Sequence, residues 1–116
     1  MATIKMCTDI PQSKVLATIL PLESADMYYD RYGTPSVIDK YVTHESIKND
    51  KYHHLTPCWS LAALLSVLPK PSLHQTKDGE WYCNAEPNRL YFSSHYNNPV
   101  DACVAMIEKL HELKLL

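Results

Sequence analysis

Apolar residues recur at helical spacing in the middle of the chain, in the stretch LTPCWSLAALLSVLP from Leu55 to Pro69. Thr56 can accept a free backbone N–H and Pro57 suits the first helical position, so the pair predicts a helix that begins at Pro57. Pro69 predicts its end near Val67. The other side is also largely apolar, so we expect this helix to be buried in a core. Four leucines share one face of it: Leu61, Leu64, Leu65 and Leu68.

After this helix the pattern changes to that of strands. Turn signals at Asp78-Gly79 and Glu86-Pro87-Asn88 separate three short runs rich in leucine and aromatic residues. They predict an antiparallel meander with strands at 72–76, 80–85 and 89–94. The residues expected to face the core are Leu73, Trp81 or Tyr82, Cys83, Leu90 and Phe92.

Both ends of the chain predict helices. Asn98 as N-cap, Pro99 after it and Asp101 in the first turn predict a C-terminal helix of about four turns. The stretch TDIPQSKVLATILP predicts a short helix that is capped by Thr8 or Asp9. Its inward residues are expected to be Val15, Leu16, Ile19 and Leu20. Residues 30–54 show no clear period and are expected to be rich in loops, with a strand at 37–42 as an alternative.

The elements together predict an α+β fold. A three-stranded or larger antiparallel sheet packs against helices, and the C-terminal half has the order helix, three strands, helix. A chain of 116 residues with 46% hydrophobic residues is long enough for one core, so we expect a single domain over residues 1–116.

Charge argues against two classes of partner. Eleven basic and thirteen acidic residues give a net charge of −2, without the basic surplus typical of proteins that bind nucleic acids or anionic membranes.

The first residues, MATIKMCTDIPQSK, lack the apolar core of a signal peptide, and no apolar run approaches the length of a membrane span. We expect a cytoplasmic protein.

The order helix, three strands, helix is also that of a double-stranded RNA-binding domain. That family holds phosphates with lysines at the start of its second helix, where this chain reads NNPVDACVAM, with Asp101 and no lysine. A nucleic-acid module therefore stays as an alternative that depends on the folded surface. It would require one patch made of Lys40, Lys48, Lys51, Lys70 and Lys77.

Metal and catalytic motifs are missing from the pattern. The four cysteines form no CxxC pair, and His44, His53, His54 and Cys58 match no zinc spacing. Cys58 is the one thiol for which a helix N-terminus would lower the pKa. We expect no metal, no cofactor and no catalytic residue. A small enzyme stays as a third class, which would need a pocket that brings a cysteine or carboxylate near a histidine.

Tyrosine is the most suggestive feature of the composition, with eight residues. Tyrosine offers a large amphipathic contact area and is enriched in protein interfaces, although it is also an ordinary half-buried strand residue. We expect Trp59 to lie in the first turn of its helix and to be only partly covered. The predicted protein-binding residues are Tyr28, Tyr29, Tyr32 and Trp59. An exposed edge strand with surplus aromatic residues would also favour a homodimer.

Three segments, QSKVLATILPLESADMYY, PCWSLAALLSVLPK and VDACVAMIEKLHELKLL, carry the pattern QSK, SADM, WSLxALL and DAxxxMI. This pattern resembles a group of short uncharacterised proteins of gut bacteria and their prophages, over most of the chain outside residues 30–54. The resemblance implies an α+β domain and an association with mobile elements, and it brings no activity, catalytic residue or cofactor. We therefore expect a small phage or mobile-element accessory protein that binds a host or phage protein.

Overall fold

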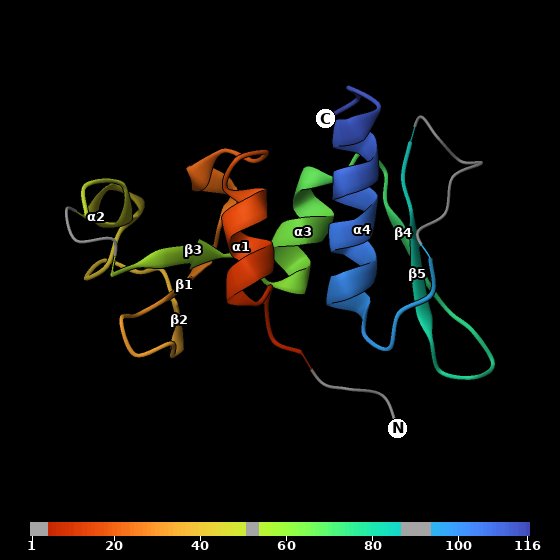
Figure 1. Ribbon diagram of the computed structural model, residues 1–116, viewed down its shortest axis with the longest axis horizontal. Helices are drawn as coiled ribbons and strands as arrows, with labels where there is room; N and C mark the ends of the chain where they lie inside the picture. The colour runs from red at the N-terminus through yellow and green to blue at the C-terminus, as the bar shows by residue number, and fades with distance from the viewer. Residues whose placement is uncertain (1–4, 51–53, 87–93) are drawn as a thin grey trace.

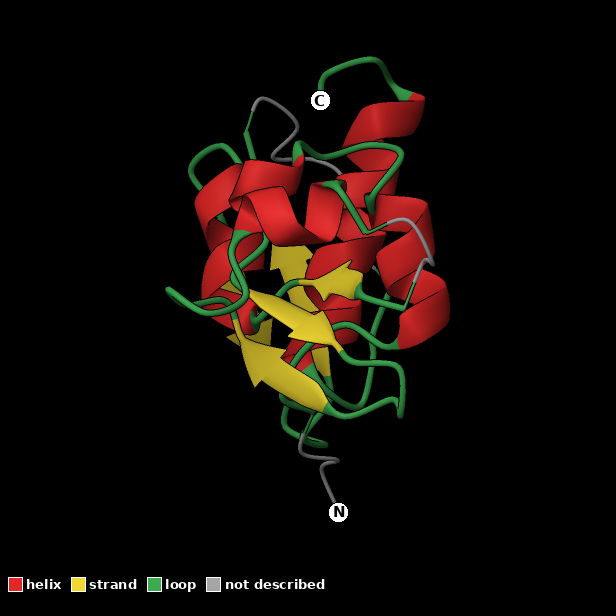
Figure 2. Cartoon of the chain, turned by 90° about the vertical axis from the view of Figure 1, so that its left-hand side faces the viewer, coloured by secondary structure: helices red, strands yellow, loops and turns green. Residues whose placement is uncertain are grey.

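Three helices form a layer between a small sheet and a β-hairpin (Figure 1). The computed structural model describes residues 5–50, 54–86 and 94–116. Figure 2 views the molecule from the side of the small sheet, whose strands lie in front of the helical layer. The helices of the layer are α1 (Ile10–Leu16), α3 (Leu61–Val67) and α4 (Pro99–Glu112). The predicted α+β class, with a three-stranded antiparallel sheet and helices, is confirmed.

One strand of the sheet lies within residues 30–54, the part of the chain without a clear period, and the other two flank this part. Its strands are β1 (Met27–Tyr29), β2 (Pro35–Val37) and β3 (Thr56–Cys58), in the order β2-β1-β3. Met27 at its centre pairs with Val37 on one side and with Cys58 on the other. Each strand has only three residues, too few to show the alternation by which strands are recognised.

Pro57 does not begin the central helix, which corrects the predicted start. Thr56 precedes a proline and is therefore biased to extended backbone, and both residues pair with β1. The helix starts after Ser60, which has extended backbone and accepts the backbone N–H of Ala63 through Oγ at 3.2 Å. Its end at Val67 agrees with the prediction.

The hairpin consists of β4 (Ser72–Gln75) and β5 (Trp81–Asn84), which confirms the first two strands of the predicted meander. Gly79 in its turn has φ +83°, the left-handed conformation that glycine adopts without strain. The third predicted strand, with Leu90 and Phe92, lies outside the described residues apart from its last position. The backbone of Trp81 exchanges hydrogen bonds with Tyr96 instead, at 2.6 and 2.8 Å.

The two terminal helices are where the caps predicted them. Asn98 accepts the backbone N–H of Asp101 at 2.8 Å and so begins α4, and Asp9 caps α1. Thr8, the alternative cap, is buried instead. Val15 is exposed rather than inward, because α1 covers the core with only one narrow face. Two short helices complete the fold: η1 (Leu22–Ser24) and α2 (His44–Lys48).

The main core lies between the helices and the hairpin. Helix α4 contributes the largest share, packs on β5 and contacts α3. Leu73 and Trp81 are partly buried against this cluster, and Cys83 is fully buried in it. A second, smaller cluster of Cys7, Met27 and Cys58 lies where the N-terminal segment meets the sheet.

Candidate functional site

Two turns of the same construction flank strand β2. In the first, the Asp30 carboxylate accepts the backbone N–H of Tyr32 at 2.9 Å, and the Arg31 guanidinium lies 4.8 Å from the centre of the Tyr32 ring. In the second, Asp39 accepts the backbone N–H of Tyr41 at 2.8 Å. Each is an Asp-basic-Tyr sequence in which the aspartate shapes the turn and the cation lies over the ring.

The second turn repeats the ring contact of the first. The Lys40 ammonium lies 5.1 Å from the centre of the Tyr41 ring. Asp39 also accepts the backbone N–H of Val42, at 3.0 Å, and its hydrogen bonds from the backbone lower its pKa. Asp30 likewise accepts a second backbone N–H, that of Thr34, at 3.0 Å. Both carboxylates are therefore occupied by backbone, and the cations and rings are left facing solvent.

The rings and the strand between them are open to solvent. Tyr32 is 76% exposed, Tyr41 is 79% exposed, and Val37 at the end of β2 is 65% exposed. These three side chains belong to one segment of ten residues. We call Arg31, Tyr32, Val37, Lys40 and Tyr41 the tyrosine-turn surface.

The edges of the sheet are poorly suited to adding another strand. Thr34 accepts the N–H of Asp30 and Ile38 donates its N–H to Asp26, both at 3.0 Å, so these two residues face β1. Backbone groups alternate in direction along an antiparallel strand, so those of Pro35 and Val37 point away from β1. Pro57 on the opposite edge strand also points away from β1. Proline has no N–H to donate, so each edge has a proline at an outward position.

The four residues predicted to bind a partner are in different surroundings. Tyr32 is at the surface, as expected, and Tyr28 is half-buried in β1. The hydroxyl of Tyr29 donates to the carbonyl oxygen of Thr8 at 2.8 Å, and burial, aided by Cys7, raises its pKa. Trp59 has no exposed surface and donates through Nε1 to Ser24 Oγ at 2.9 Å, so the expectation of a partly covered ring is wrong.

Tyr41 is the residue of this surface that the tyrosine pattern alone did not single out. The signal was present as a short repeat, Asp-Arg-Tyr at 30–32 and Asp-Lys-Tyr at 39–41. An aspartate two residues before the tyrosine can accept its N–H, which is the physical content of the repeat.

Cys58 does not have the surroundings of an activated nucleophile. Cys58 lies in β3 rather than at a helix N-terminus, and burial together with the neighbouring Cys7 raises its pKa. The expected mechanism for a lowered pKa is therefore absent. Within the described ranges, no three His, Cys, Asp or Glu side chains are arranged to hold a metal ion.

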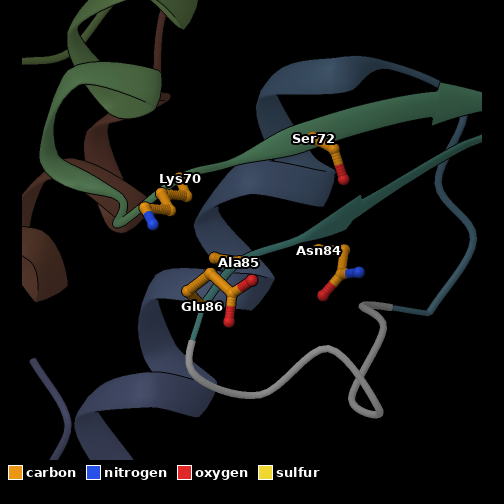
Figure 3. Close-up of a pocket in the computed structure, with 5 residues that line it drawn as sticks. All are labelled: Lys70, Ser72, Asn84, Ala85 and Glu86. Atoms are coloured by element: carbon orange, nitrogen blue, oxygen red, sulfur yellow. The ribbon is translucent and has the colours of Figure 1, made fainter.

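Two hollows in the described part of the surface are lined by polar and charged side chains. One of about 250 Å³ lies beside the start of β4 and the end of β5, and Figure 3 shows its lining residues. Asn84 contributes to it an amide oxygen that is buried without a hydrogen-bond partner. No histidine is among its described lining residues, which are Lys70, Ser72, Asn84, Ala85 and Glu86.

The second hollow, of about 330 Å³, brings Glu23 and Glu45 near His44. The His44 ring is already held by the main chain, because its Nε2 lies 2.6 Å from the carbonyl oxygen of Ala25. This contact fastens α2 to the segment before β1 and gives the histidine a structural role.

The lysines named for a nucleic-acid patch are spread over the molecule. Lys48 belongs to α2, and Lys77 belongs to the turn of the β4–β5 hairpin. These elements lie at opposite ends of the longest axis, which measures 43 Å (Figure 1). Lys51 lies outside the described residues. The described lysines therefore do not form the single patch that the nucleic-acid alternative requires.

Comparison with protein-family models, with curated proteins and with solved structures found no match to this chain. None of the helices in the described part of the chain has the length and apolar character needed to span a bilayer.

Proposed function

We propose that this protein acts by binding another protein through the tyrosine-turn surface. The observation that carries the proposal is the pair of Asp-basic-Tyr turns, each of which holds an exposed ring beneath a cation at one end of β2. Tyr32 keeps the role expected for it, whereas Tyr41 and Val37 take the place of the buried Trp59.

The two tyrosines are held in place before any partner binds, which supports a role in protein binding. The backbone at each tyrosine is held by an aspartate, and each ring is in contact with a cation, so little conformational entropy is lost when a partner covers the rings. Tyrosine and arginine are also the residue types that contribute most at the centres of protein interfaces.

The charge of the segment favours a protein over a nucleic acid. Asp30 and Asp39 balance Arg31 and Lys40, so the segment from Asp30 to Lys40 has no net charge. A surface that binds a phosphate backbone needs a surplus of positive charge. The exposed Val37 side chain also suits an apolar protein surface.

The partner follows from the family resemblance. A small accessory protein of a phage or mobile element, working in the cytoplasm, would bind a host or phage protein. The prolines on both sheet edges argue against a homodimer built by strand addition, so the contact would be made by side chains.

The test is a pull-down from a host lysate, with and without nuclease, followed by mass spectrometry. The bait is compared with Tyr32→Ala/Tyr41→Ala and with a control, Met6→Ala/Val15→Ala, that removes exposed apolar area elsewhere. We expect a partner protein whose capture persists after nuclease treatment. The control should capture as much of it as the unmodified bait does, and the tyrosine variant should capture less by a factor of roughly ten or more.

Two results would contradict the proposal. If the tyrosine variant captures the same proteins as the control, the tyrosine-turn surface is not the contact. If capture depends on nucleic acid and is lost with nuclease, the charge argument is wrong and the nucleic-acid alternative replaces the proposal. The thermal unfolding of all variants is compared first, to show that each is folded.

A further inference from the structure

The fold brings together all four cysteines in two pairs. Cys58 Sγ lies 3.7 Å from Cys7 Sγ, and Cys103 Sγ lies 3.9 Å from Cys83 Sγ. The partners are 51 and 20 residues apart in the chain, and all four are buried thiols that belong to no disulfide. No spacing in the sequence indicates either pair, so both result from tertiary packing.

Each pair joins two different segments of the fold. Cys7 precedes α1 and is attached beside β3 by an isolated bridge between Cys7 and Ser60. Cys58 is the last residue of β3. In the second pair, Cys83 lies on β5 and Cys103 lies on α4, the helix that packs on that strand.

We propose that the two pairs are sites of disulfide formation, Cys7 with Cys58 and Cys83 with Cys103. A disulfide has an S–S length of about 2.05 Å, so each pair of sulfurs must approach by less than about 2 Å. Rotation of the cysteine side chains and small backbone movements would supply this approach.

The reaction is a thiol–disulfide exchange with a low-molecular-weight disulfide as oxidant. One protein thiolate attacks a sulfur of the oxidant, which releases one small thiol and leaves a mixed disulfide. The partner cysteine loses its proton and attacks the protein sulfur of that mixed disulfide, which releases the second small thiol. Each cysteine pair gives up two electrons and two protons. The oxidant takes them up and leaves as two small thiols.

Burial determines how readily each pair reacts. Burial raises the pKa of Cys58. In the second pair, the hydrogen bond between the two thiols lowers the pKa of Cys83 and, together with burial, raises that of Cys103. Because the thiolate is the reactive form, exchange requires local opening of the fold. Cys7 is 3% exposed and belongs to the smaller cluster, whereas Cys83 and Cys103 are fully buried in the main core. The Cys7–Cys58 pair should therefore be oxidised first.

The surroundings of the first pair connect it with the sheet. The Tyr29 hydroxyl lies 3.5 Å from Cys7 Sγ, and Tyr29 is the last residue of β1, directly before the first Asp-basic-Tyr turn. A Cys7–Cys58 bond would fasten the N-terminal segment to β3. In a reducing cytoplasm the thiols are the resting state, and the bonds form under oxidising conditions.

The test treats the folded, reduced, full-length protein with oxidised glutathione. Samples are quenched over time with an alkylating agent in denaturant, and intact mass and peptide maps are recorded. Each bond should lower the recorded mass by the two alkyl groups that its cysteines no longer take up and by about 2 Da for the two hydrogens lost, first once and then twice. The peptide maps should show Cys7 linked to Cys58 before Cys83 is linked to Cys103.

A sample unfolded in denaturant before oxidation is the control for geometry, and it should give mixed pairings. The proposal fails if all four thiols of the folded protein are still alkylated at times when this control is oxidised. It also fails if the pairings in the folded protein are as mixed as in the control, or if glutathione remains attached to the cysteines. Cys7→Ser/Cys58→Ser and Cys83→Ser/Cys103→Ser should each retain one bond, and the wild-type peptide map decides the matter if either variant does not fold.

Discussion

Asp101 shows at the scale of one residue how a polar group becomes part of the packing. Its Oδ1 accepts from Lys5 Nζ at 2.7 Å and from Gln12 Nε2 at 2.8 Å, and its Oδ2 accepts from Asn98 Nδ2 at 2.8 Å. Burial alone would raise the pKa of Asp101, but the hydrogen bonds from Lys5, Gln12 and Asn98 outweigh it, and the pKa is lowered. The carboxylate joins the N-terminal segment and α1 to the start of α4.

A lowered pKa makes this contact dependent on acid. The contribution of the Asp101 contacts to the unfolding free energy is fully present above the pKa of the unfolded chain, about 3.9. It is lost as the pH falls through the lower pKa of the folded state. We expect Asp101→Asn to reduce the unfolding free energy by about 1–2 kcal/mol at neutral pH and to flatten the fall of this free energy at pH values below about 4. Urea denaturation over a pH series measures both effects.

Lys5→Met provides the matching control for Asp101→Asn. If the pair is the source of the acid dependence, this variant should also flatten the profile, and the double variant should add little to either single change. A profile of Asp101→Asn that runs parallel to that of the wild type would contradict the assignment.

At the scale of an element, the start of α3 is fixed by a residue from outside the helix. Ser60 caps the helix, and the Asp26 carboxylate accepts both its backbone N–H, at 2.9 Å, and its hydroxyl. Asp26 directly precedes β1. The beginning of the central helix is thus tied to the beginning of the sheet, which a cap within the helix alone would not achieve.

This tie reverses the usual preference among capping residues. Aspartate is normally as good an N-cap as serine, but at position 60 it would place a second carboxylate against Asp26. We expect Ser60→Ala to lower the unfolding free energy by about 1–2 kcal/mol and Ser60→Asp to lower it further. Thermal unfolding of both variants checks the order.

Thr43 offers the comparison for Ser60→Asp. It caps α2 and accepts the backbone N–H of Ser46 at 3.2 Å, without an aspartate bonded to the cap. Thr43→Asp should therefore be tolerated. If Ser60→Asp is as stable as the wild type, the contact with Asp26 does not control this helix start.

At the scale of the whole molecule, the sheet is joined to the main core by the buried residue Thr8. Thr8 donates its N–H to the Trp59 carbonyl at 2.9 Å, and its Oγ1 accepts the Trp59 N–H at 3.1 Å. Its carbonyl oxygen accepts from Tyr29 in β1, and its hydroxyl lies 2.7 Å from Ser13 in α1. One buried residue therefore holds β1, α1 and the start of α3 together.

These contacts predict that the chain unfolds in one transition. In Trp81→Phe the remaining tryptophan, Trp59, lies at the junction of sheet and helices. Its fluorescence and the far-ultraviolet circular dichroism should give the same urea midpoint, because the sheet cannot separate without breaking the Thr8 contacts. Separate midpoints would show that the sheet is a unit of its own, against the single domain expected for residues 1–116.

The sequence by itself determined the elements whose signals are local. Asp9 and Asn98 accept backbone N–H groups within their own first helical turns, so the starts of α1 and α4 could be predicted from neighbouring residues. Asp78-Gly79 did the same for the β4–β5 hairpin, because glycine at this turn adopts a positive φ. The even charge balance also follows from composition alone.

Only the tertiary structure decided the features that depend on distant partners. Thr56 and Pro57 read locally as a helix start, but pairing with β1 makes them a strand. Tyr29 and Tyr32 look alike in the sequence, yet one hydroxyl bonds to Thr8 and the other side chain faces solvent. The cysteine pairs join residues up to 51 positions apart. Strand pairing, burial and thiol contacts are made between residues far apart in the chain, so no local pattern of the sequence records them.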